Sequence, residues 1–214
     1  MLRSTAPRAH ADAAFLAAKR ARLDEPHVGP LNALAVQVER TVRRPAPRVD
    51  PDSGGTGARV LLLLETPSTA AYGSGIVSLD DDDATSAVLW QALDDSGLDR
   101  RSTVLWNAVP WFTGTPERGA APTAGELRLG QTWLLPFLTL LPRLAVVVAL
   151  GRSAQTAAAP FSTATRALRG RQLRVLLAPS PDQRVDDGPG ADGRDRVRAA
   201  LTEAAEALRP ERSR

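Results

Sequence analysis

Two polar side chains stand at the ends of short apolar runs, where packing alone does not explain them. Asn107 follows the run Thr103–Trp106, and its amide offers two donors and one acceptor in a fixed plane. Such a group, held at the end of a strand, suits reading the edge of a planar heterocycle, although an Asn that caps a turn has the same signature. Glu65 follows Arg59–Leu64. Because an unpaired buried carboxylate is costly, this residue indicates either a site or an ion pair with Arg152.

Four apolar runs of strand length carry these residues and two others, Arg152 and Ser180, which follow the third and fourth runs. Segments with helical spacing separate the runs, a pattern typical of a parallel sheet covered by helices. The expected strands are Arg59–Leu64, Thr103–Trp106, Leu144–Leu150 and Leu173–Leu177, and the expected helices are Ala11–Leu23, Leu31–Arg40, Thr85–Leu93, Leu127–Leu140, a segment beginning at Ala154, and Arg194–Leu208. The sequence therefore predicts a three-layer α/β/α sandwich with a mostly parallel four-stranded central sheet. Ligands of such sheets bind beyond the carboxyl ends of the strands, where all four polar residues would lie.

The composition limits the chemistry that the chain can perform. Its 214 residues, 43% of them apolar, predict one domain over residues 27–214 after a helical, frayed extension over residues 1–26. With no Cys and only two His, we expect no disulfide, iron–sulfur cluster, cysteine nucleophile or metal site. We find no membrane-length apolar stretch and no signal-peptide pattern, so we expect a cytoplasmic protein. The net charge of +3 is compatible with nucleic acid without requiring it.

The order of the motifs resembles the uracil-DNA glycosylase superfamily, most closely an actinobacterial-type branch without an iron–sulfur cluster. ETPS follows the first strand, then come SGIVS, NAVPW after the second strand, LGRSAQ after the third and APSP after the fourth. The resemblance extends from about His27 to the C-terminal helix. It implies a DNA-repair hydrolase that needs no cofactor or membrane, acts as a monomer, flips a damaged base out of single- or double-stranded DNA and cuts its bond to deoxyribose.

The first motif, with Glu65, Thr66, Pro67 and Ser68, is similar to the water-activating motif written GEAPG or GQDPY. The resemblance makes Glu65 the catalytic carboxylate, because it matches the acidic residue of the GEAPG form. Thr66 falls where the GQDPY form has its catalytic Asp. Thr66, Pro67 and Ser68 would contact the substrate, with backbone N–H groups near Pro67 and Ser68 covering O2 of the uracil.

The other motifs supply the expected contacts to the base. Asn107 matches the Asn that reads the uracil edge and is expected to act in both binding and catalysis. Gly75 and Ile76 fall at the substrate, and Ile76 replaces an aromatic ring that commonly stacks on uracil. Ala178 replaces the His of the HPSP motif, so it cannot donate a hydrogen bond to O2. A donor of this kind is typically worth about 2.7–4 kcal/mol in the transition state.

Two segments are expected to contact DNA, each with a simpler alternative. Arg152 and Ser153 open a helix after a strand, which suits phosphate binding, although an ordinary strand-to-helix turn looks the same. Pro179, Ser180 and Pro181 match a loop that wedges into DNA in the family, or they only stiffen a turn.

The identity of the carboxylate and the activity itself stay open at this stage. Asp80 or Asp83, in the acidic run Asp80–Asp83, is an alternative to Glu65 as the water-activating group, although such a run also suits a solvated loop before a helix. Since Ile76 and Ala178 depart from the family pattern, the main alternative function is a catalytically weak or inactive member that binds DNA or a nucleobase. A third possibility is that the fold serves another small ligand.

Overall fold

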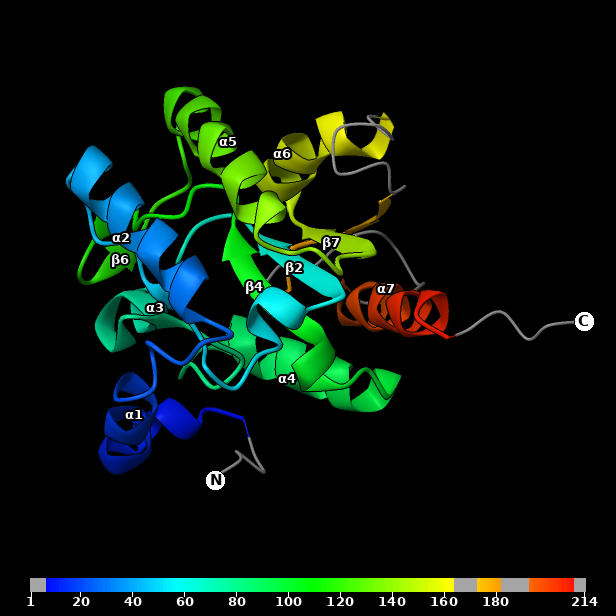
Figure 1. Cartoon of the computed structure of the whole chain (residues 1–214), viewed down its shortest axis with the longest axis horizontal. Coiled ribbons are helices and arrows are strands. Elements are labelled where there is room, and N and C mark those ends of the chain that lie inside the picture. The colour runs from blue at the N-terminus through cyan, green and yellow to red at the C-terminus, as the bar shows by residue number, and fades with distance from the viewer. Residues whose placement is uncertain (1–6, 164–172, 182–192, 210–214) are drawn as a thin grey trace, which may run out of the picture.

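A computed structural model describes residues 7–163, 173–181 and 193–209 of the chain (Figure 1). Its central sheet consists of β2 (Val60–Leu64), β4 (Thr103–Asn107), β7 (Val146–Leu150) and β8 (Arg174–Ala178). These strands lie in the order β4-β2-β7-β8, and every neighbouring pair is parallel. The predicted α/β fold with a parallel four-stranded sheet is therefore confirmed.

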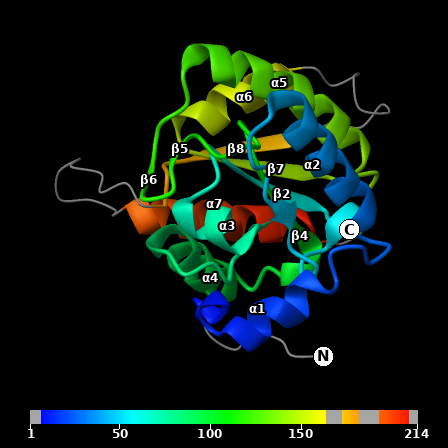
Figure 2. The same ribbon diagram turned by 90° about the vertical axis from the view of Figure 1, so that its left-hand side faces the viewer.

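Helices cover both faces of the sheet, which gives the three predicted layers (Figures 1 and 2). Successive residues of β2 serve opposite faces, because side chains alternate along a strand. Leu61 and Leu63 pack with α2, α5 and α6, whereas Val60 and Leu62 pack with α4 and α7. The helices are α1 (Ala13–Arg20), α2 (Gly29–Val42), α3 (Thr69–Ser74), α4 (Ala84–Ser96), α5 (Ala124–Thr139), α6 (Arg152–Thr163) and α7 (Gly193–Ala207).

Two pairs of short strands lie outside the strands and helices expected from the sequence. In the first, β1 (Arg48–Val49) pairs in parallel with β3 (Ile76–Val77). In the second, β5 (Gly114–Thr115) and β6 (Arg118–Gly119) form an antiparallel pair. Single-turn 3₁₀ helices complete the chain at η1 (Ala9–Ala11), η2 (Gly55–Gly57) and η3 (Arg100–Ser102). The two-residue strands are too short to show the alternation that identifies a strand in sequence.

Several predicted boundaries move by a few residues for identifiable reasons. The first helix begins only at Ala13, because the Asp12 side chain accepts hydrogen bonds from two backbone N–H groups of its first turn. Strand β4 includes Asn107, which is in register with Leu64 of β2. Helix α4 continues three residues past its predicted end at Leu93, to Ser96, and Gly97 adopts φ 68° at its C-cap. The first six residues of the predicted extension, and nearly all of the loop predicted over residues 182–193, lie outside the described residues.

A cluster of six charged side chains ties the N-terminal helix to the rest of the fold. We call it the anchoring cluster; its members are Lys19, Arg22, Asp50, Asp52, Asp80 and Arg100. Lys19 is only 2% exposed, and its ammonium lies 2.8 Å from Asp50 and forms a short ion pair with Asp80. Arg100 lies 2.6 Å from each of the same two carboxylates. Three cations thus face three anions, as burial of charge requires.

Candidate active site

A cavity of about 350 Å³ lies at the carboxyl edge of the sheet, beside the ends of β2 and β4. Its volume is in the range of small-ligand sites. It lies at the topological switch point of the sheet, because the strand after β2 in the chain, β4, lies on one side of β2 and the next, β7, lies on the other. The polar residues that line it include three carboxylates, one amide and several hydroxyls, among them Glu65, Asp81, Asp83, Asn107, Ser68 and Ser78.

Asn107 is the polar group of the cavity that most clearly lacks a protein partner. Its register with Leu64 holds the backbone at the end of β4, and its side chain is buried, with a relative exposure of 1%. Within the described residues, its Oδ1 has no hydrogen-bond partner. Because a buried polar atom without a partner is costly, this amide is better suited to holding a ligand than to capping a turn.

Glu65 directly follows β2, and its side chain packs against the turn between β7 and α6. Its Oε1 accepts a hydrogen bond of 2.8 Å from the backbone N–H of Ser153, in the first turn of α6. The positive end of that helix favours a carboxylate. Gly151 adopts φ 88°, and a Cβ atom there would lie 2.7 Å from Cδ of Glu65. Among the described residues no ion pair joins Glu65 to Arg152, so the helix terminus, rather than a guanidinium, accounts for this carboxylate.

Ser68 and Asp83 form a second polar pair in the cavity wall. The Ser68 hydroxyl donates a hydrogen bond of 2.6 Å to Oδ2 of Asp83. Each residue also caps a helix: Ser68 accepts from the N–H of Ala71, and Asp83 accepts from the N–H of Ser86 at 2.7 Å. Two helix starts therefore fix the position of this carboxylate beside the first motif.

The acidic run contributes Asp81 to the cavity, a residue that sequence reasoning did not single out. Asp81 is 2% exposed and accepts hydrogen bonds from the Ser74 hydroxyl and the Ser78 N–H, both at 3.0 Å. Burial raises the pKa of its carboxyl, and a hydrogen bond with His10 works in the opposite direction. Asp80, which the sequence offered as a candidate base, instead belongs to the anchoring cluster and is absent from the cavity lining.

The predicted substrate-binding residues are placed in different surroundings. Thr66, Pro67 and Ser68 line the cavity, as does Ser180, which was predicted to contact DNA. Ile76 is fully buried and does not line the cavity. The neighbouring Val77 lines the cavity instead and provides part of its apolar wall. Gly75 lies outside the lining and ends α3 with φ 74°.

The predicted DNA-binding residues divide between two surfaces. Arg152 and Pro179 line a neighbouring groove between α6 and α7, as does Ala178, which was predicted to bind the substrate; Asn107 is not part of this groove. The N–H of Ser153 is engaged by Glu65, which leaves it unsuited to a phosphate in this arrangement. Pro181 is buried, directly after the cavity residue Ser180.

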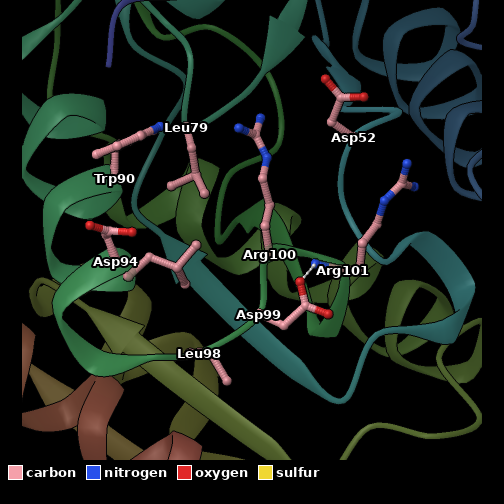
Figure 3. A pocket seen from close by; sticks show the side chains of 9 residues that line it. Asp52, Leu79, Trp90, Asp94, Leu98, Asp99, Arg100 and Arg101 are labelled. Carbon is pink, nitrogen blue, oxygen red and sulfur yellow. Dashed lines mark hydrogen bonds between the residues drawn. The ribbon is translucent and has the colours of Figure 1, made fainter. Parts of the chain in front are cut away.

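A second cavity of about 220 Å³ lies beside α4 and η3, near the start of β4 (Figure 3). Leu79 and Trp90 form part of its apolar wall, and Arg100 extends beside them. The guanidinium of Arg100 donates to two carboxylates of the anchoring cluster, and Asp99 accepts from the N–H of Arg101. Because these polar groups are already engaged within the protein, the cavity at the carboxyl edge is the better candidate site.

The sequence comparisons identify the family of the chain. The family model described as "Uracil DNA glycosylase superfamily" matches residues 51–204, which is more than half of the chain. The chain therefore belongs to the uracil DNA glycosylase superfamily. No curated protein sequence gives a significant match. No helix within the described part of the chain is long and apolar enough to cross a membrane.

Proposed function

We propose that this chain is a DNA base-excision glycosylase that hydrolyses the bond between deoxyribose and uracil, or a related deaminated base. Membership of the superfamily implies a glycosylase-like function and DNA binding. The observation that carries the finer proposal is the buried Asn107 amide, whose unpartnered Oδ1 lies in a cavity that also contains three carboxylates. The proposed enzyme acts as a cytoplasmic monomer of the branch without an iron–sulfur cluster.

Asn107 would read the base. Its Oδ1 can accept from N3–H of uracil while its amide N–H donates to O4. Cytosine has an acceptor at N3 and an amino donor at the neighbouring position, so it would leave buried polar groups unpaired. A rigid amide at the end of a strand therefore favours uracil, provided that the base is flipped out of the DNA stack.

Hydrolysis would follow from the same arrangement. The bond between C1′ and N1 breaks with its electron pair on the base, and the oxygen of a water molecule forms the new bond to C1′. A carboxylate that holds this water accepts its proton, and solvent later protonates the base. Donors beside the base oxygens stabilise the anionic leaving group. The products are free base and an abasic site.

Two carboxylates compete for the role of base. Glu65 matches the first motif, and one of its oxygens is held by the Ser153 N–H. Asp83 lines the same cavity and is held by Ser68 and by the start of α4. We keep Glu65 as the proposed base and Asp83 as its alternative. Conservative amides separate them, because Gln at position 65 and Asn at position 83 can still accept the N–H hydrogen bonds.

The DNA strand would extend from the cavity toward the groove between α6 and α7. Arg152 is exposed at the rim of that groove, and Pro179 lies within it. Since arginine at a backbone contact supplies affinity without sequence preference, Arg152 would bind phosphate. Pro179, Ser180 and Pro181 would shape the strand end that meets the DNA.

The alternative function, a binding module without catalysis, is favoured by one specific observation. Ala178 is buried at the end of β8 and offers no side-chain donor, so the base oxygen would lack one hydrogen bond. The deciding experiment is single-turnover cleavage of single- and double-stranded oligonucleotides that carry uracil, hypoxanthine or xanthine. An abasic product supports the glycosylase, whereas DNA binding without any product supports the binding module.

Three variants test the site assignment within the same assay. If Glu65 is the base, Glu65→Gln lowers the chemical rate with little change in DNA affinity. Asp83→Asn then retains most of the parental chemical rate. The reverse result moves the role to Asp83. Ala178→His raises the rate if the base lies where the superfamily places it. Failure of all three variants to change the rate would contradict the proposed site.

A further inference from the structure

The N-terminal segment reaches the wall of the candidate site from outside the region that the family model matches. The match begins at residue 51, whereas η1 and α1 lie between Ala9 and Arg20. Two polar residues of this segment are buried: His10 is 8% exposed and Lys19 is 2% exposed. Both contact the stretch from Ser78 to Asp81 that lines the cavity or supports it.

His10 makes two contacts with the acidic run. Its backbone N–H donates to the carbonyl of Asp80 at 2.9 Å, and its ring Nδ1 lies 2.8 Å from Oδ1 of Asp81. Both side chains of the second contact are 3% exposed. Because an ionised carboxylate can only accept, Nδ1 must carry the proton in this hydrogen bond. The backbone contact and the ring contact together fix His10 against the acidic run.

The hydrogen bonds of Asp81 define the direction of its carboxylate. Oδ1 accepts from His10 and from the Ser74 hydroxyl, and Oδ2 accepts from the Ser78 N–H. A carboxylate has about four acceptor positions, so these donors leave about one free. Asp81 lines the cavity, so this remaining acceptor position is the one that water or a ligand in the cavity would use.

Lys19 supports the neighbouring part of the wall. Its ammonium donates to the Ser78 hydroxyl at 3.2 Å and pairs with Asp80 on the other side. The Ser78 hydroxyl in turn donates to Asp50 of the anchoring cluster. Ser78 and Asp81 are both cavity residues, so two side chains of the N-terminal segment hold two positions of the wall.

We propose that His10 is a positioning residue of the site, which orients the Asp81 carboxylate toward the bound base or the attacking water. This inference rests on the proposed glycosylase function. A merely structural role would be filled as well by any group of similar size, whereas a positioning role requires a donor at the place of Nδ1. A misplacement of about 1 Å in a reacting group can cost up to about 100-fold in rate.

The chain offers a matched pair of variants and a control. His10→Asn keeps an amide donor close to the position of Nδ1, whereas His10→Gln moves the donor to the position of Nε2, which has no hydrogen-bond partner among the described residues. His27→Gln is the control, because this second and last His of the sequence contacts the carbonyl of Pro51 instead of the cavity wall. Both amides are polar, so the pair separates donor position from loss of polarity.

The first measurement does not depend on activity. Amide hydrogen exchange by NMR follows the Ser78 N–H, which donates to Asp81. We expect exchange about tenfold faster or more in His10→Gln, because one hydrogen bond to a charged group is lost. His10→Asn and His27→Gln should exchange like the parent. Unchanged exchange in His10→Gln would overturn the inference, whatever the activity of the protein.

The second measurement is single-turnover cleavage beside DNA affinity on the best deaminated-base substrate. We expect a lower rate at saturating enzyme in His10→Gln, an unchanged Kd for DNA, and rescue in His10→Asn. Faster Ser78 exchange with a parental rate would show that the contact is structural and overturn the positioning role. A parent protein that cleaves no substrate refutes the proposed function instead, and the exchange data then decide alone whether His10 holds Asp81.

Discussion

Replacing Lys19 by Met tests whether the anchoring cluster stabilises the fold. Met retains most of the length of the side chain but removes the cation. Lys19 has the carboxylates of Asp50, Asp52 and Asp80 within 3.4 Å, and these side chains are at most 7% exposed. The variant therefore leaves three buried anions facing two cations. Breaking a buried charge pair in this way typically costs about 3–5 kcal/mol.

The loss can be measured by urea unfolding and by thermal melting. For a chain of this size, 1 kcal/mol corresponds to about 2–4 °C in Tm, so we expect Tm to fall by roughly 6–20 °C. Arg198→Met is the control, because Arg198 pairs with Asp195 at 2.9 Å with both side chains about half exposed. Such surface pairs contribute about 0–1 kcal/mol.

A second substitution distinguishes unpaired charge from lost packing. Adding Asp80→Asn to Lys19→Met removes one of the orphaned anions and should recover part of the lost stability. If Lys19→Met lowers the free energy of unfolding by no more than the Arg198→Met control, the reasoning about buried charge in this cluster is wrong.

Three further outcomes are expected. Asn107→Asp should lower uracil cleavage by about 10–100-fold and relax rejection of cytosine, since a donor becomes an acceptor; competition assays between the two bases check this, and a parental preference would contradict it. Gly151→Ala should slow cleavage, since the added Cβ would clash with the carboxylate of Glu65 and displace it. Gly97→Ala is the control, because Gly97 has a similar φ of 68° but open space around it, so this variant should only lose stability. Equal cleavage rates in the two variants would exclude the displacement. Burial works to raise the pKa of Asp50, but Arg100 and Lys19 outweigh it and hold that pKa far below its usual range. Its contribution to stability is therefore present above the unfolded pKa and is lost as the pH falls below about 4, and urea titrations between pH 7 and 2.5 should show this decline.

The layers of the fold could be predicted because their signals are local. Apolar runs such as Thr103–Trp106 identify buried strands without knowledge of their neighbours, and parallel pairing brings the residues after them to one edge. Asn107 and Glu65 could therefore be named from sequence as residues of that edge. The partner of Glu65 could not, because Ser153 lies 88 residues away along the chain.

The misplaced residues show where sequence patterns lose their power. Ile76 and Val77 are successive residues of a strand and serve opposite sides, so a motif comparison that is off by one position selects the wrong side chain. The four adjacent Asp residues of the acidic run cannot be told apart by sequence pattern. Cations that are distant along the chain determine which of them points away from the cavity. Asp80 meets Lys19 and Arg100, whereas Asp81 remains in the cavity wall.

The anchoring cluster also has a consequence for the order in which the chain is completed during synthesis. Asp80 follows its partner Lys19 by 61 residues, which at 5–20 residues per second corresponds to about 3–12 s of translation. Arg100 is made later still. Until both have left the ribosome, Lys19 has only Asp50 and Asp52 as partners, and the cluster that buries its ammonium is incomplete. Helix α1 thus finds its place only after the segment through Arg100 has been made.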